Sequence, residues 1–235
     1  MAAILIATTN SGKLREFRTL LAPIQVTSAD ALGLELEVEE SGLTFRENAM
    51  LKARAFAAAS GCVTLADDSG LEVHALDGGP GVSSARFGGP GLDDAGRCRL
   101  LLEELRDVDG RQRRGAQFRC CLVALAPDGR TCETEGICRG SIELEMRGTS
   151  GFGYDPVFYV PECHVTMAQL PTAAKNEISH RARAIATMRP RLFETFPELV
   201  LREPKLAGAE GSCLKHPPIH PLTHSPLPPP LRGES

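Results

Sequence analysis

The sequence has no excess of positive charge and no long hydrophobic run. Its 235 residues carry a formal net charge of −4, so there is no bulk electrostatic attraction to nucleic acid or to an anionic membrane. Any anionic ligand must therefore be held by a local cluster. Residues 1–7 are apolar, but they have no basic flank and are too few for a signal sequence or a membrane helix. We expect a cytoplasmic protein whose partners include no nucleic acid and no membrane.

The sequence also has no Cys-x-x-Cys pair, although it contains eight cysteines. Two of them, Cys120 and Cys121, are neighbours in an apolar run. In a protein that is not exported, such thiols are expected to stay reduced and to pack as small hydrophobic side chains. We therefore predict neither a disulfide framework nor a zinc site.

The composition predicts one globular domain followed by a tail. Hydrophobic residues make up 42% of the chain and charged residues 24%, which is typical of a soluble domain. The segment 206–235 holds 7 of the 17 prolines and 3 of the 6 histidines, and it has no periodic apolar pattern. We predict a domain over residues 1–204 and a disordered Pro/His-rich tail over residues 205–235.

Within the domain, strand and helix patterns alternate, which indicates an α/β fold with an antiparallel meander. A capping box of Thr44 and Glu47 begins one helix, and Gly61 is expected to end it. Pro190 is expected to bend or break the last helix. The predicted strands are 3–7, 25–28, 63–67, 71–76, 117–126, 131–138 and 142–146, and the predicted helices are 13–21, 44–60, 93–105 and one beginning at 179.

Two adjacent carboxylates are the most informative feature of the chain. Asp67 and Asp68 follow the apolar residues 63–66, and Ser69-Gly70 is typical of a turn. Carboxylates at the carboxyl end of a buried strand lie where open α/β sheets bind ligands. Neighbouring carboxylates repel each other, so we expect a cation such as Mg²⁺ beside them. Taken alone, the motif is more often an Asx-type turn that closes a strand.

The first predicted strand leads into the polar loop Thr8, Thr9, Asn10, Ser11, Gly12 and Lys13, and then into a helix. Free backbone N–H groups, the positive helix end and a lysine together favour an anion site. The loop does not match the Walker A pattern. The alternative is a helix capped by Asn10 or Ser11, with Lys13 in solvent.

Three further groups of residues indicate a ligand. Glu40 could join the acidic pair, and Asn48 and Lys52 share one helix face, although Lys52 alone is typical of a solvated face. Glycines flank Phe152, so a ligand could stack there, or the segment could be a glycine-rich hairpin with core aromatics. Lys175, His180 and Arg181 are expected at a helix start, where their charges oppose the helix dipole unless a ligand compensates.

Together these segments resemble the inosine triphosphate pyrophosphatase (Ham1-like) family over about residues 3–202. The similarity rests on ordered matches at family spacing: 7–13, 40–49, 66–71, 84–86, 151–156 and 179–181. The resemblance implies an elongated mixed β-sheet flanked by helices, two lobes with a central active-site cleft, and a homodimer. It also implies Mg²⁺-dependent hydrolysis of ITP, dITP and XTP to the monophosphate and pyrophosphate.

The resemblance further assigns roles to individual residues. Thr8 to Lys13 would cradle the triphosphate, Glu40 and Asp68 would hold Mg²⁺, and Asp68 would activate the attacking water. Substrate contacts are implied for Ser69, Phe152, Gly153, Tyr154, Asp155, Lys175, His180 and Arg181. The ranking of the three substrates and the element that excludes GTP stay open.

Two other functions compete with this interpretation. A pyrimidine or modified-nucleotide pyrophosphatase of related fold would share the phosphate loop but lack Ser179-His180-Arg181. A non-catalytic nucleotide-binding protein would have lost the acidic residues, which are present here.

Overall fold

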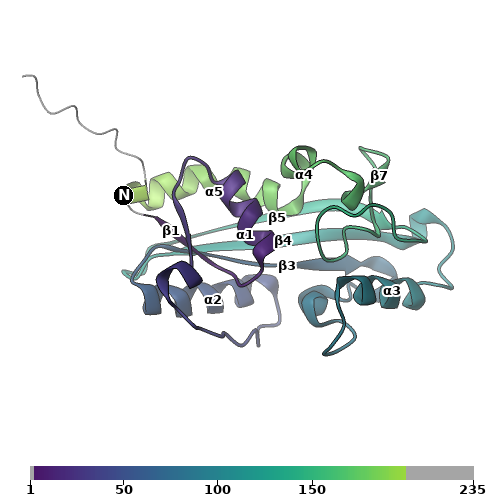
Figure 1. The fold of residues 1–235 in the computed structure, drawn as a ribbon, viewed down its shortest axis with the longest axis horizontal. Coiled ribbons are helices and arrows are strands. Elements are labelled where there is room, and N and C mark those ends of the chain that lie inside the picture. Colours follow the sequence, from purple (N-terminus) through teal and green to yellow (C-terminus); the bar gives the residue numbers. More distant parts are fainter. Residues whose placement is uncertain (1–2, 200–235) are drawn as a thin grey trace, which may run out of the picture. The chain divides into compact units, whose positions relative to one another are not determined.

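The computed structural model describes residues 3–199, in which a mixed sheet has the strand order β2-β1-β3-β4-β5-β6-β7 (Figure 1). β1 pairs in parallel with β2 and β3, and the remaining pairs are antiparallel. The strands are β1 (Ile4–Ala7), β2 (Val26–Ser28), β3 (Thr64–Val73), β4 (Gly115–Leu125), β5 (Thr131–Ile142), β6 (Phe158–Val160) and β7 (Val165–Thr166). The α-helices are α1 (Ser11–Leu20), α2 (Phe45–Ser60), α3 (Asp94–Glu104), α4 (Thr172–Ile178) and α5 (His180–Thr195). The predicted α/β class is confirmed.

Helices cover both faces of the sheet because its buried strands are apolar on both sides. On one face, α1 and α5 pack through Phe17 and Ile185 against Ile4 and other strand residues. On the opposite face, α2 packs through Phe56 against Leu5. Successive strand residues point to opposite faces, so neighbours such as Ile4 and Leu5 belong to different core clusters. Figure 1 shows α1 and α5 on one side of the long strands and α2 on the other.

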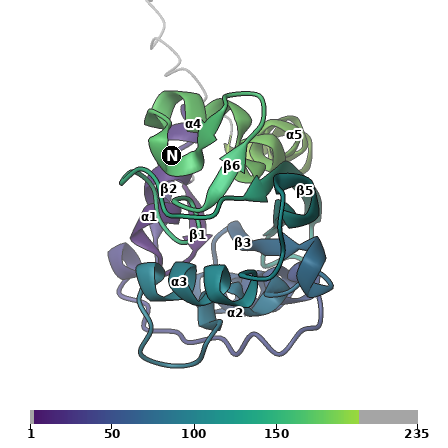
Figure 2. The same ribbon diagram turned by 90° about the vertical axis from the view of Figure 1, so that its right-hand side faces the viewer.

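A third core cluster lies at the far end of the long strands. There Leu101 of α3 shares a buried cluster with Phe118 of β4, Phe158 of β6 and Met167. Figure 2 views the molecule from this end, with α3 and α4 on opposite sides of β6. The two ends of the sheet therefore have separate cores, in agreement with the two lobes that were expected.

One predicted break in the chain is wrong. β3 runs without interruption from Thr64 to Val73, through the predicted turn at Ser69-Gly70. Gly70 is needed for a close approach: a Cβ there would lie 2.5 Å from the carbonyl oxygen of Gly81, in the 3₁₀ segment Gly81–Arg86. This glycine therefore admits a packed segment and does not turn the chain.

The end of the meander also differs from the prediction. β5 ends at Ile142, and residues 143–147 bond irregularly to the following loop, with the Glu143 amide donating to the Val157 carbonyl over 2.8 Å. α4, β6 and β7 are too short for a clear sequence pattern. Pro190 does not break α5, which continues to Thr195 and buries Leu192 beyond it, because packing on the sheet supports both halves.

Further predictions concern the ends of α2, the cysteines, membrane helices and the tail. The capping box is present, since the Glu47 amide donates to Thr44 Oγ1 over 3.1 Å, and Gly61 has the left-handed conformation of a helix end. The seven cysteines of the described part are free thiols. Across residues 3–199, no helix is both long and apolar enough to cross a membrane. The predicted boundary at residue 204 and the Pro/His-rich tail lie outside the described residues.

Candidate active site

The polar loop after β1 leads into α1 as predicted. Asn10 is the N-cap, and its side chain accepts a hydrogen bond from the Lys13 amide over 3.0 Å. Thr8, Thr9, Asn10 and Lys13 line a hollow of about 320 Å³ that also touches Glu40 and Lys52. Ser11 is exposed and does not line this hollow. The loop thus places backbone, amide and ammonium groups beside carboxylates.

Gly12 has a different function from its neighbours. It is buried, and a Cβ at this position would lie 2.7 Å from Cδ1 of Phe152. The ring of Phe152 therefore packs directly on the first turn of α1. Gly12 admits the aromatic ring to the site and does not line the hollow of the polar loop.

The two adjacent aspartates point to opposite faces of the sheet. Because β3 is continuous, its side chains alternate, and Asp67 turns toward α1 and α5 whereas Asp68 turns toward α2. The two carboxylates therefore contact different partners, and the Mg²⁺ expected beside them stays a prediction. Each carboxylate has its own set of cationic partners.

Asp67 lies in a fully buried cluster of opposite charges. Its Oδ2 accepts from Arg181 Nε at 3.2 Å and Nη2 at 3.1 Å, and from the Cys120 thiol at 3.1 Å. Its Oδ1 pairs with Lys13 Nζ. Burial alone would raise the pKa of Asp67, but Arg181 and Lys13 outweigh it and hold the pKa far below its usual range. Asp67 is thus a permanent anion that joins α1 and α5 to β3.

Asp68 has a more open environment. Its Oδ2 accepts from Asn48 Nδ2 at 3.2 Å and its Oδ1 from Lys52 Nζ at 3.1 Å. The pKa of Asp68 is raised, chiefly by burial and also by the negative charge of Glu40, although the charge of Lys52 opposes the shift. A carboxylate with a raised pKa, paired with a lysine that lines a hollow, suits proton abstraction.

Glu40 and Asp68 share one ammonium group. Lys52 Nζ lies 2.5 Å from Glu40 Oε1 and 3.1 Å from Asp68 Oδ1, so Lys52 is part of the site and not a solvated helix position. Within residues 3–199 no group of three or more His, Cys, Asp or Glu could hold a metal alone. Two carboxylates around one cation fit Mg²⁺, which is commonly bound by one or two carboxylates with water and substrate phosphates. The Glu40 and Asp68 carboxylates therefore fit the oxygen-ligand preference of Mg²⁺.

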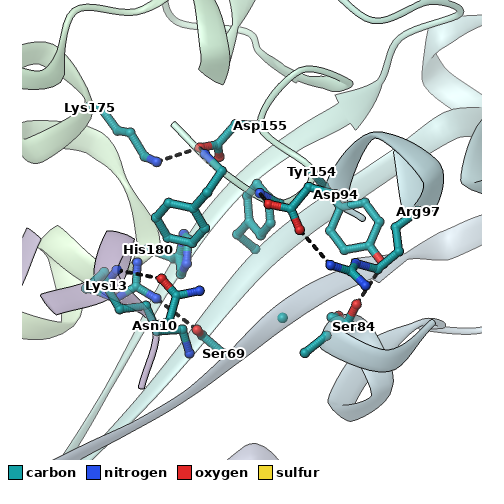
Figure 3. Close-up of a pocket in the computed structure, with 16 residues that line it drawn as sticks. Asn10, Lys13, Ser69, Ser84, Asp94, Arg97, Tyr154, Asp155, Lys175 and His180 are labelled. Atoms are coloured by element: carbon teal, nitrogen blue, oxygen red, sulfur yellow. Dashed lines mark hydrogen bonds and ion pairs between the residues drawn. The ribbon is translucent and has the colours of Figure 1, made fainter. Parts of the chain in front are cut away.

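A second hollow of about 150 Å³ lies beside the first (Figure 3). Asn10, Lys13 and Ala85 line both, so the two hollows adjoin. The second hollow brings together most of the remaining predicted residues, namely Ser69, Phe152, Gly153, Tyr154, Asp155, Lys175, His180 and Arg181. Segments that are far apart in the sequence thus meet at one polar and aromatic cavity.

The Phe152 ring is held by an ion pair. The Phe152 amide donates to Asp155 Oδ2 over 2.9 Å, and the same oxygen lies 2.6 Å from Lys175 Nζ. The ammonium nitrogen of Lys175 lies 4.6 Å from the centre of the Phe152 ring, within cation–π range. Lys175 belongs to α4, whereas the prediction placed it at the start of the helix that follows.

His180 and Arg181 begin α5, as predicted, but their environments differ. The imidazole of His180 stacks on Phe118 with ring centres 4.8 Å apart, and burial holds its pKa well below the usual value, so the ring is neutral. Its Nδ1 is buried and has no hydrogen-bond partner among the described residues. A buried unpaired nitrogen at a cavity wall is a candidate ligand contact.

Arg181 is already paired with protein groups. Besides Asp67, its guanidinium contacts Glu16 Oε2 at 2.5 Å and Ser69 Oγ at 2.9 Å. Sequence reasoning missed Glu16, whose Oε1 also lies 3.0 Å from Lys175 Nζ. Its one signal in the sequence is its position three residues after Lys13 on the same helix. These contacts favour a positioning function for Arg181.

Comparisons with known proteins identify the family of this chain. The pattern of the Ham1 family matches residues 4–191. A dITP/XTP pyrophosphatase of Bacillus licheniformis is 46% identical over 187 residues, which cover 79% of this chain and 95% of that protein. One of Desulforamulus reducens is 48% identical over 184 residues, covering 77% and 91%.

Solved structures give the same result. The Ham1 protein of Staphylococcus aureus superposes with a TM-score of 0.72 at 40% identity, covering 82% of this chain and 98% of that one. A HAM1 protein from Coxiella burnetii gives a TM-score of 0.74 at 39% identity, covering 83% and 100%. The expected resemblance is thus confirmed, and the chain belongs to the Ham1 family.

Proposed function

We propose that this chain hydrolyses the non-canonical purine nucleoside triphosphates ITP, dITP and XTP to the monophosphate and pyrophosphate. The observation that carries the proposal is Asp68, a carboxylate of raised pKa that accepts from Lys52 Nζ, whose ammonium also pairs with Glu40 at the wall of the cation-lined hollow. That hollow adjoins the aromatic one. The first hollow has the charge for phosphates, and the second has the ring and polar atoms for a base. Relatives at 46% and 48% identity are dITP/XTP pyrophosphatases.

In the proposed reaction, water attacks the α-phosphorus and pyrophosphate leaves. Asp68 accepts the proton of the attacking water, which its raised pKa favours. Lys13 and the amides at the start of α1 stabilise the charge on the phosphate oxygens. Lys52 holds Asp68 and Glu40 in place. Glu40 and Asp68 would hold Mg²⁺, which supplies charge neutralisation for the triphosphate when bound.

The base would be recognised in the aromatic hollow. Phe152 offers a stacking face that any base could use. The unpaired Nδ1 of His180 can donate a hydrogen bond to the C6 oxygen of a 6-oxopurine when it carries the ring proton. Adenine presents an amino donor at that position. In the tautomer with the proton on Nδ1, two donors would then face each other and the buried nitrogen would stay unpaired, at about 1–3 kcal/mol. We therefore expect ITP and XTP to be preferred to ATP.

We further propose that the protein acts in the cytoplasm as a homodimer. The homodimer rests on the resemblance to the family, and the cytoplasmic location on the expectation drawn from the sequence. Light scattering coupled to gel filtration tests the homodimer, since a dimer has twice the chain mass of 25.2 kDa.

A substrate panel tests the proposed function. We expect pyrophosphate release from ITP, dITP and XTP with Mg²⁺, much slower release from ATP, and none after chelation of the metal. Preferred hydrolysis of dTTP or UTP would instead indicate a pyrimidine pyrophosphatase. Binding of ITP without any turnover would indicate a nucleotide-binding protein.

A further inference from the structure

The loop that carries Phe152 is held from two sides by two carboxylates. The Phe152 amide donates to Asp155 Oδ2 over 2.9 Å, and the next amide, that of Gly153, donates to Asp94 Oδ2 over 2.7 Å. Each carboxylate also has a cationic partner. Asp155 pairs with Lys175 at 2.6 Å, and Asp94 pairs with Arg97 Nη2 at 2.7 Å. Figure 3 shows these two ion pairs at different edges of the cavity.

The hydrogen bond to Asp94 connects the loop to α3, which lies far before the loop in the sequence. Two further bonds run between the same loop and this side of the cavity. The thiol of Cys98 on α3 donates to the Gly153 carbonyl at 3.4 Å, and Tyr154 Oη donates to the Ser84 carbonyl at 2.8 Å. The backbone on the carboxyl side of Phe152 is thus fixed by α3 and the 3₁₀ segment Gly81–Arg86.

The carboxylate of Asp94 is not needed to cap its own helix. Asp93 is the N-cap of α3, and its side chain accepts from the Gly96 amide over 2.7 Å. Arg97 is fixed by a second bond, from Nη1 to the Leu92 carbonyl at 2.6 Å. Both Asp94 and Arg97 line the aromatic hollow. The Asp94–Arg97 pair therefore holds the loop through the Gly153 amide and forms part of the cavity wall.

We infer that Asp94 and Arg97 are positioning residues for the nucleobase, which orient the Phe152 ring through the Gly153 amide. The inference rests on the proposed function and adds a second ion pair to the base site. Loss of the Asp94 carboxylate leaves the Gly153 amide without its acceptor, and of the two carboxylates only Asp155 then still holds the backbone beside the stacking face. Binding through the base weakens, whereas binding through the phosphates, about Lys13 and Lys52, stays unchanged.

The test uses the variant Asp94→Ala and measures separately how well the protein binds the base and how well it binds the phosphates. We expect the Kd for IMP, measured by calorimetry without metal, to rise about tenfold, as loss of a hydrogen bond to a charged group predicts. The KM for ITP should rise by a similar factor while kcat stays within about threefold. Inhibition by inorganic tripolyphosphate, which has no base, should be unchanged.

Two further variants separate positioning from a loss of stability. Glu103→Ala is the matched control, because Glu103 lies on the same helix as Asp94, pairs with Arg106 just beyond the helix end and does not line the cavity. It should leave IMP binding unchanged. Asp94→Asn keeps an oxygen for the Gly153 amide and should recover part of the IMP affinity.

Any of four results overturns the inference. Asp94→Ala could leave IMP binding unchanged, or it could weaken inhibition by tripolyphosphate as much as IMP binding. Asp94→Asn could lose as much IMP affinity as Asp94→Ala, or Glu103→Ala could lose the same IMP affinity. A wild-type protein that binds no IMP and releases no pyrophosphate from ITP contradicts the proposed function itself. The two failures are therefore distinguishable.

Discussion

Two neighbouring residues of the same type perform different tasks in this chain. Asp67 and Asp68 differ because a continuous strand sends them to opposite faces of the sheet. Asp67 is itself fully buried and meets a guanidinium, an ammonium and a thiol. Asp68 meets one amide and the ammonium of Lys52, a residue that lines the hollow of the polar loop. The first is suited to stability and the second to chemistry.

Asp67→Asn should destabilise the protein strongly. The side chains of Asp67 and Arg181 are 0% and 1% exposed, and removal of one partner leaves buried positive charge, which typically lowers the free energy of unfolding by about 3–5 kcal/mol. Thermal melting should show a drop of roughly 10 °C. Asp68→Asn is the matched control and should melt close to the wild type. Equal melting temperatures for the two variants would contradict the assignment of Asp67.

His180 predicts a pH dependence of stability. Burial lowers the pKa of this imidazole, and the charge of Arg181 lowers it further, whereas the unfolded chain protonates it near pH 6.5. Below that pH the unfolded state binds the extra proton, so the free energy of unfolding falls by up to about 1.4 kcal/mol per pH unit. Denaturant unfolding between about pH 7 and about pH 5 measures this slope.

The variant His180→Gln should reduce that slope, because it removes the titrating group. His74→Gln, at an exposed histidine, should leave the slope as it is in the wild type. If His180→Gln kept the full slope, the acid destabilisation would come from other groups.

At the scale of helices and strands, features that depend on residues close in sequence could be predicted. Features that depend on residues distant in sequence could not. The capping box of α2 depends on neighbours in sequence and was predicted, and the N-cap at Asn10 was one of the two caps that the alternative interpretation of the polar loop allowed. β3 was predicted as two strands because Ser69-Gly70 has the composition of a turn. Position 70 needs a glycine because the 3₁₀ segment Gly81–Arg86 packs against it. That segment lies more than ten residues further along the sequence.

Gly136 shows how one element positions another. A Cβ on this β5 residue would overlap the His180 carbonyl and would lie 3.0 Å from Cα of Ala184. Gly136→Ala should therefore displace the start of α5, which carries His180 and Arg181. We expect a loss of stability of about 1–3 kcal/mol together with a higher KM for ITP. Chemical denaturation and steady-state kinetics measure both.

The exposed neighbour Glu135 on the same strand provides the control. Glu135→Ala should change neither quantity appreciably. If Gly136→Ala behaved like this control, α5 could approach β5 without the glycine.

At the scale of the whole molecule, the site depends on residues from both ends of the domain. Sequence reasoning selected Lys175, His180 and Arg181 because their charges were unfavourable at a predicted helix start, and the structure brings them to the cavity. It missed Glu16, whose partners Lys175 and Arg181 follow it by more than 150 residues. It also missed Asp94 for the same reason. A pairing across the fold leaves no local pattern in a single sequence.

The tail is predicted to be dispensable for activity. Residues 206–235 have no periodic apolar pattern and contain seven prolines, so they lack the hydrophobic surface needed to pack on a core. Deleting them should leave kcat, KM and the melting temperature unchanged. A clear drop in melting temperature would show that the tail stabilises the domain.

The most direct test of the central claim is pyrophosphate release from ITP by the wild type and by Asp68→Asn. An amide of the same size cannot accept the proton of the attacking water and binds a hard cation poorly. With Mg²⁺ present, we predict that kcat falls on the order of a hundredfold or more, while the melting temperature stays close to that of the wild type. Retention of more than about a tenth of the wild-type kcat would contradict the assignment of Asp68 as the catalytic base.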